Sequence, residues 1–232
     1  RTLSDLIATR DPVAFDPENY RHVSIAARGL FALDMLLFDP AFSEYEQDSY
    51  TCALVRAVTR DLSGQAVALH ALWRDAFAKT LRTAGAPGNA TYMNEGEALR
   101  ALYTQILSDL EFTADQRLGR PLGSFDTPRP TRAEAWRSGR SLRNVVLSAD
   151  AAQALAHWLI DTPLPATDSA AARVRQAATA VVDPAFQSIA APQERLHVEI
   201  VQQAVQALRA AVQAEVGAPL GLSTGFNSQD GD

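Results

Sequence analysis

The sequence has 232 residues, 47% hydrophobic and 21% charged, which fits one or two globular domains and excludes disordered and collagen-like chains. Its formal net charge is −6, and its basic residues are nearly all arginines scattered among acids, so a general nucleic-acid-binding surface is excluded. The single cysteine, Cys52, excludes an internal disulfide framework and a cysteine-cluster metal site, and no apolar stretch is long enough to span a membrane.

The start of the sequence does not resemble a natural N-terminus. It has no Met, no basic segment and no apolar signal segment, so we expect a signal segment upstream of residue 1. Helices that pair with absent upstream segments would leave an apolar patch exposed. An N-terminal segment of the same protein is therefore an expected partner.

Strong helix formers dominate the chain, and the alternation typical of strands is almost absent, so we predict an all-α fold. Residues 1–18 are predicted to form a loop or a short turn. A first helix is expected over 18–38, ended by Asp39-Pro40, and a long second helix over 43–83. The predicted buried stripe of the second helix is Leu54, Val58, Leu62, Leu69, Trp73, Phe77 and Leu81.

The second half of the chain is predicted to contain five further helices. A helix over 91–112 precedes an irregular segment rich in Gly and Pro near 113–135. Thr131 and Glu134 fit a capping box, which predicts a helix from there to about 147. Later helices are expected to about 160, over 168–189 and over 192–216, with Pro192 in the first turn of the last one.

Long helices joined by short loops are typical of helical bundles. The chain therefore fits two packed bundles, divided into halves of about 1–112 and 113–232, or one bundle with an irregular excursion near 113–147.

A first candidate site lies in the segment 27–34, where Arg28 and Asp34 are set among apolar residues. Asp34 shares a predicted helix face with Leu30 and Phe31, and a buried carboxylate needs a partner. It is interpreted either as a ligand contact or as half of an Arg–Asp pair that joins helices. Gly29, in the middle of the predicted helix, indicates close approach of another backbone or of a ligand.

A second candidate is the arginine-rich segment 135–144. Arg137, Arg140 and Asn144 fall on one face of the predicted helix, where guanidinium groups suit a carboxylate or phosphate. The alternative is a solvated basic face with Trp136 in the core. Ser138 and Ser141 add hydroxyl donors to the same segment.

The remaining signals are weaker. The polar tail contains Phe226, Asn227 and Asp230, but its spacing does not match a calcium loop. Glu194 and His197 have the spacing of a di-iron half-site, without the second copy that such a site needs. The motifs of zinc proteases, serine hydrolases and P-loop proteins are absent.

Together, the segments 24–38, 129–144 and 220–232 resemble the imelysin-like family of bacterial envelope proteins, in the same order along the chain. The resemblance implies an exported, often iron-regulated all-helical protein of two four-helix bundles with a functional cleft between them. Its localisation would be periplasmic or outer-membrane-associated, with membrane contact only through an upstream lipid anchor. The resemblance also implies either metallopeptidase activity, which is the founding claim for the family, or a role in iron uptake, as in a related branch.

The chain departs from the family's Gly-x-His-x-x-Glu signature. Gly29 keeps the glycine, but Phe31 stands at the histidine and Asp34 at the glutamate. Because a phenyl ring cannot ligate a metal or carry a proton, we expect no metal or other cofactor here.

The leading hypothesis is therefore a non-catalytic protein that binds a small ligand or peptide in the cleft. Asp34 would accept hydrogen bonds from Arg28 or from an arginine of 137–143, and the tail residues would close the cleft. The predicted ligand contacts are Arg28, Gly29, Phe31, Asp34, Trp136, Arg137, Ser138, Arg140, Ser141, Asn144, Phe226, Asn227 and Asp230. The alternatives are a metallopeptidase with a rearranged metal site and a structural module that acts through its surface.

Overall fold

The computed structural model describes residues 2–222, and these form only helices, turns and loops, which confirms the predicted all-α class. The chain divides into two compact units, residues 1–83 (unit 1) and 84–232 (unit 2). A division near residue 112 was also expected from the sequence. The helix that ends there packs on later helices and belongs to unit 2.

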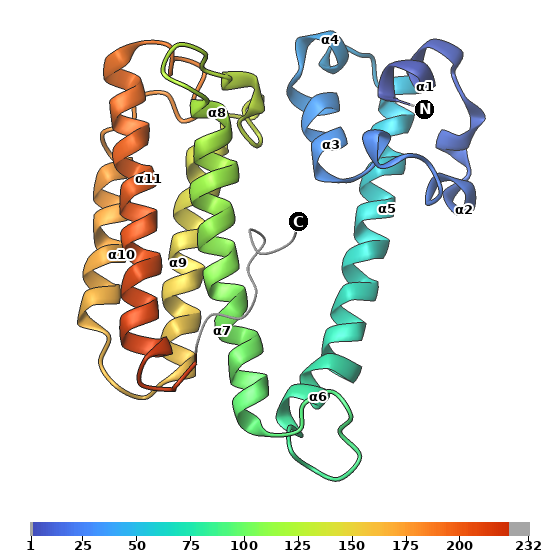
Figure 1. The fold of residues 1–232 in the computed structure, drawn as a ribbon. Coiled ribbons are helices and arrows are strands. Elements are labelled where there is room, and N and C mark those ends of the chain that lie inside the picture. The colour runs from blue at the N-terminus through green and yellow to red at the C-terminus, as the bar shows by residue number, and fades with distance from the viewer. Residues whose placement is uncertain (1, 223–232) are drawn as a thin grey trace. The chain divides into compact units, whose positions relative to one another are not determined.

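Unit 1 consists of one long helix and several short ones (Figure 1). Its helices are α1 (Leu3–Thr9), α2 (Pro17–Tyr20), α3 (Gly29–Phe38), α4 (Pro40–Ser43), α5 (Tyr50–Leu72) and α6 (Ala78–Arg82). A π-helical segment, Trp73–Phe77, joins α5 to α6 and keeps the predicted second helix nearly intact. The predicted loop or short turn over residues 1–18 is wrong, because Thr2 and Asp5 cap each other's backbone and start α1.

The core of unit 1 gathers around the first half of α5. Leu54, Ala57 and Val58 are buried there, against residues of α1 and α3. Leu62 still packs against this core, but farther along the helix the predicted buried stripe is wrong, since Leu69 and Trp73 are 68% and 50% exposed. The short helices of unit 1 do not reach that far along α5, as Figure 1 shows.

Over residues 84–222, unit 2 is a bundle of four long helices with one short one. Its helices are α7 (Glu95–Phe112), α8 (Arg120–Leu122), α9 (Ser141–Leu159), α10 (Pro165–Ala178) and α11 (Pro192–Val212). A π-helical segment, Thr113–Gly119, continues α7 into α8, and a second one, Gln213–Gly217, follows α11. Pro192 is the first residue of α11, as predicted.

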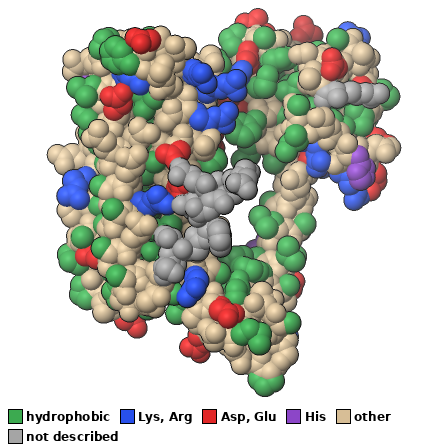
Figure 2. Space-filling model, viewed as in Figure 1, with side chains coloured by type: hydrophobic (Ala, Val, Ile, Leu, Met, Phe, Trp, Pro, Cys, Tyr) green, Lys and Arg blue, Asp and Glu red, His purple; other side chains and the backbone are tan. Residues whose placement is uncertain are grey.

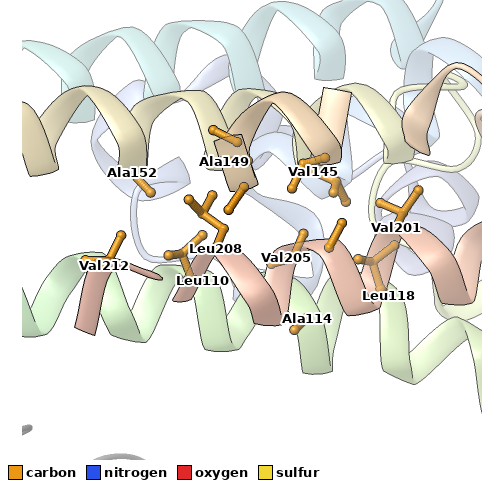
Figure 3. Close-up of a cluster of buried hydrophobic side chains, with 14 of the residues drawn as sticks. Leu110, Ala114, Leu118, Val145, Ala149, Ala152, Val201, Val205, Leu208 and Val212 are labelled. Atoms are coloured by element: carbon orange, nitrogen blue, oxygen red, sulfur yellow. The ribbon is translucent and has the colours of Figure 1, made fainter. Parts of the chain in front are cut away.

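Apolar residues at helical spacing build the core of unit 2 (Figure 3). In the close-up of Figure 3, α7 with its π-helical continuation, α9 and α11 each contribute a row of apolar side chains to this cluster. The labelled members are Leu110, Ala114 and Leu118, then Val145, Ala149 and Ala152, and then Val201, Val205, Leu208 and Val212. This core holds both ends of the loop between α8 and α9.

Candidate functional site

The chain enters α3 through a turn rather than through the continuous helix predicted over 18–38. A 3-10 turn, Ile25–Ala27, is capped by the Ser24 hydroxyl, and Arg28 is extended with φ −132°. Gly29 has φ +81°, and a Cβ on it would meet nothing within 4 Å. The glycine is therefore needed for a left-handed backbone and not for the close approach that was expected.

Arg28 is paired with Asp61 of α5. Its Nε and Nη2 donate hydrogen bonds of 3.0 and 2.9 Å to the two carboxylate oxygens, and Gln65 Nε2 donates to the same group at 2.7 Å. The side chains of Arg28 and Asp61 are only 22% and 9% exposed. The expected hydrogen bond from Arg28 to Asp34 is wrong, because Asp61 occupies the guanidinium fork.

A pocket of about 480 Å³, here called the unit 1 pocket, opens beside this pair. Tyr20 lies in its wall and donates to the carbonyl of Ala27 at 2.8 Å. Burial, together with the charge of Asp61, holds the pKa of this phenol well above its usual value, so it stays a neutral donor. Arg60 and Arg21 also line the pocket, with Pro17, Ala57 and Ala68 as small apolar walls.

Phe31 and Asp34 lie on the outward face of α3. Phe31 and its neighbour Leu30 are 67% and 73% exposed, and Asp34 is half-buried. The Asp34 side chain has no hydrogen bond or ion pair within the described part of unit 1. Because its face of the helix is open, the carboxylate does not need the partner that a buried position was expected to require.

The arginine-rich segment of unit 2 begins as a turn and not as the predicted helix. Ala135 and Gly139 have left-handed backbone conformations, with φ +53° and +67°, and these interrupt the predicted helix. The helix α9 begins only at Ser141, so Arg137 does not share a helix face with Arg140 and Asn144. Thr131 and Glu134 form no capping box, since Thr131 lies inside a 3-10 turn, Pro130–Arg132.

Several polar groups of this segment are engaged locally. Ser138 donates to the carbonyl of Ala135 at 3.1 Å, and buried Ser141 donates to the carbonyl of Glu134 at 2.7 Å. The Arg137 guanidinium lies over the Trp136 ring at 4.5 Å from its centroid. The two hydroxyls therefore fix the turn that carries Arg137 and Trp136, and Trp136 packs against the core of unit 2.

Sequence reasoning missed Arg117, which ties this turn to the bundle. Its Nε donates to Glu134 at 2.5 Å, and its Nη1 donates to Ser148 at 2.6 Å and to Thr113 at 3.0 Å. The available signal was an arginine within the irregular 113–135 segment. Its partners Glu134 and Ser148 could not be predicted, because they lie 17 and 31 residues away in the sequence. Asp61, 33 residues from Arg28, was missed for the same reason.

The predicted site residues are thus distributed over both units. Arg28, Gly29, Phe31 and Asp34 belong to unit 1, and the residues from Trp136 to Asn144 belong to unit 2. Phe226, Asn227 and Asp230 lie outside the described residues. That the two segments act on one ligand stays a prediction.

The described residues contain no candidate metal centre. Within residues 2–222, no group of three or more His, Cys, Asp or Glu side chains could hold a metal ion. Glu194 Oε1 and His197 Nδ1 lie 3.9 Å apart and are joined by no third such side chain there. Over the same residues, no helix is both long and apolar enough to cross a membrane.

The fold and the site define an all-α protein with a four-helix bundle and with an arginine–aspartate pair, Arg28 and Asp61, directly before α3. The sequence matches the imelysin family (peptidase family M75) over residues 2–215, so the chain belongs to that family. No curated protein sequence and no solved structure matches it.

Proposed function

We propose that this imelysin-family chain is a non-catalytic binding protein, and that the unit 1 pocket holds a small ligand bearing a carboxylate. The observation that carries the proposal is the paired Arg28 and Asp61 in the pocket wall. A guanidinium fixed by two hydrogen bonds presents its remaining donors in one orientation, which lowers the entropy lost on binding.

The charges of the unit 1 pocket favour an anionic group. Arg28 is neutralised by Asp61, and Arg21 by Glu18. Arg60 has no ion pair in the described part of the chain and supplies one net positive charge. A single carboxylate matches this balance, and the small apolar side chains of the pocket leave room for a short aliphatic group beside it.

The motif segment supports binding over peptide hydrolysis. In the family signature a histidine stands where this chain has Phe31, and a phenyl ring can neither ligate a metal nor transfer a proton. A catalytic zinc site needs three protein ligands and an open position. Asp34 alone supplies one carboxylate on this helix.

The ligand class is tested with short peptides. Thermal shifts and calorimetry are measured with a dipeptide that has a free C-terminus and with the same dipeptide amidated. We expect saturable binding of the free acid only, and a loss of about tenfold or more in Arg60→Gln, because a charge-assisted hydrogen bond is removed. Arg82→Gln, an exposed charge change on α6, is the matched control and should bind as the wild type does.

Two results would overturn the proposal. One is equal binding of the acid and the amide, or of the two arginine variants. The other is stoichiometric metal in the purified protein together with chelator-sensitive peptide cleavage, which would favour the rearranged metallopeptidase.

We also propose an envelope location, which family membership supports. Fractionation of cells that express the natural full-length protein tests it. The protein should appear in the periplasmic or outer-membrane fraction, and recovery with the cytoplasmic fraction would contradict the proposal.

A further inference from the structure

A second, more polar pocket lies in unit 2, where α8 meets the loop that follows it. It is lined by Asp115, Gly119, Arg120, Gly123, Arg129 and Arg132 and has a volume of about 390 Å³. We call it the arginine pocket. Figure 2 shows basic side chains gathered over α8 and this loop.

A buried arginine holds the loop in place. Arg195 of α11 is 8% exposed, and its Nη1 donates to the carbonyls of Leu122 at 2.7 Å and Ser124 at 3.2 Å. Its Nε is engaged by Glu199 at 2.7 Å. A buried guanidinium is costly unless it is paired and hydrogen-bonded, so moving the loop away from Arg195 would be unfavourable. Arg195 therefore anchors the start of the loop.

The far side of the loop is fixed as well. The Arg129 N–H donates to the carbonyl of Pro121 at 2.7 Å, and Gln187 Nε2 donates to the carbonyl of Pro130 at 3.0 Å. Gly123 has φ +56°, and a Cβ there would lie 2.4 Å from the carbonyl oxygen of Thr127. These hydrogen bonds therefore fix the backbone that carries Arg129 and Arg132, although the loop is exposed.

The charges of the arginine pocket are not balanced. Arg120, Arg129 and Arg132 make no side-chain hydrogen bond or ion pair within the described chain. By contrast, Arg117 and Arg195 each bind a glutamate. Three like charges around one concavity repel one another, and Asp115 is the single acid in the lining, so a local charge of about +2 remains. An anion with two negative charges would remove this repulsion.

We propose that the arginine pocket binds a phosphate monoester whose organic part carries a hydroxyl group. Guanidinium groups match phosphate oxygens through paired hydrogen bonds, and three of them suit a dianion. The Asp115 carboxylate repels phosphate but accepts a hydrogen bond from a neighbouring hydroxyl, so it favours a hydroxylated ester over the free ion. The proposal is independent of the unit 1 pocket.

The test is calorimetry on the whole chain at pH 8 and constant ionic strength, with glycerol 3-phosphate, inorganic phosphate and chloride as probes. Glycerol 3-phosphate should bind saturably, inorganic phosphate more weakly, and chloride not at all. The double variant Arg129→Gln/Arg132→Gln should lose at least about tenfold in affinity. Arg100→Gln/Arg143→Gln makes the same charge change at exposed positions of unit 2 outside the pocket and should bind as the wild type does.

Asp115→Ala separates the ester from the free ion, because it removes both the negative charge and the hydrogen-bond acceptor, whereas the amide oxygen of an asparagine would still accept from a hydroxyl. It should strengthen the binding of inorganic phosphate and lower the preference for glycerol 3-phosphate over inorganic phosphate, while circular dichroism stays unchanged. An equal loss of affinity in both double variants would show that binding depends only on the net charge of the protein, and it would overturn the site. The absence of saturable binding would overturn it as well. Tighter binding of inorganic phosphate than of the ester in the wild type would overturn the role of Asp115.

Discussion

Arg28 and Asp61 are joined by two hydrogen bonds of 3.0 and 2.9 Å, and this pair fastens the segment before α3 to the middle of α5. It lies beside the buried Val58 and directly before the glycine of the family motif. The same contact therefore stabilises unit 1 and forms part of a pocket wall.

Asp61→Asn should destabilise unit 1 by about 2 kcal/mol, because it leaves a largely buried guanidinium without its counter-charge. Hydrogen exchange of the amides in residues 50–62, measured by mass spectrometry, reports the change. Asp75→Asn removes the acid of an exposed pair with Arg74 and should leave these amides as protected as in the wild type. Unchanged protection in Asp61→Asn would show that the pair does not hold α5.

Arg195→Lys should loosen the loop after α8. A lysine keeps the charge but lacks the forked guanidinium that reaches Glu199 and two carbonyls at once. We expect faster hydrogen exchange over residues 123–129 and weaker binding of glycerol 3-phosphate. Arg173→Lys, an exposed change on α10, should alter neither measurement, and equal exchange in both variants would contradict the anchoring role.

The helices of unit 2 could be predicted because their apolar residues repeat at helical spacing along α7, α9 and α11. The predicted break near 147–150 was wrong for a specific reason. Ser148 and Asp150, polar residues that could cap a helix, instead lie inside α9 and bind side chains of other elements, Arg117 and Arg175. Local sequence alone does not distinguish a capping residue from a polar residue with a distant partner.

The candidate site shows the same limit. Asp34 was expected to need a partner, and Arg28 was one candidate, but Arg28 pairs with Asp61 instead. Asp34 was expected to be buried because it shares a helix face with Leu30 and Phe31, but both of these residues are exposed. The actual partner of Arg28, Asp61, lies on a different helix. The pairing depends on how α3 crosses α5, which no local spacing encodes.

Asp183 should make the stability of unit 2 depend on pH. Burial alone would raise the pKa of this carboxyl, but hydrogen bonds from the N–H groups of Ala185 and Ser188, at 2.9 and 2.8 Å, outweigh burial and lower it. A lowered folded pKa stabilises the protein above the ordinary value of 3.8, and this stabilisation is lost as the pH falls through the folded pKa.

Thermal unfolding of wild type and Asp183→Asn at pH 7 and pH 3 tests this linkage. The variant should melt at a lower temperature at pH 7, and the difference should shrink toward pH 3 as the wild-type carboxylate takes up a proton. Asp161→Asn, in an exposed loop of the same unit, provides the control for loss of one negative charge. A difference that stays constant with pH would assign the effect to packing instead.

Gly217 should tolerate no larger residue, because it lies against the buried ring of Tyr103. A Cβ at this position would come within 2.2 Å of the Tyr103 hydroxyl oxygen and 2.6 Å of Cζ. Gly217→Ala should therefore destabilise unit 2 by about 1–3 kcal/mol through overpacking. Tyr103→Phe removes the nearest atom, so the double variant should recover part of the loss in urea unfolding. If the Gly217→Ala/Tyr103→Phe double variant lost as much stability as the sum of its two single variants, the clash with Tyr103 would not be the cause.

Gly64→Ala should have the opposite effect and stabilise unit 1. A Cβ at this position of α5 meets nothing within 4 Å, so the substitution causes no clash. We expect the same urea unfolding to show a gain of about 0.5–1 kcal/mol in the free energy of unfolding, because alanine has the higher helix propensity.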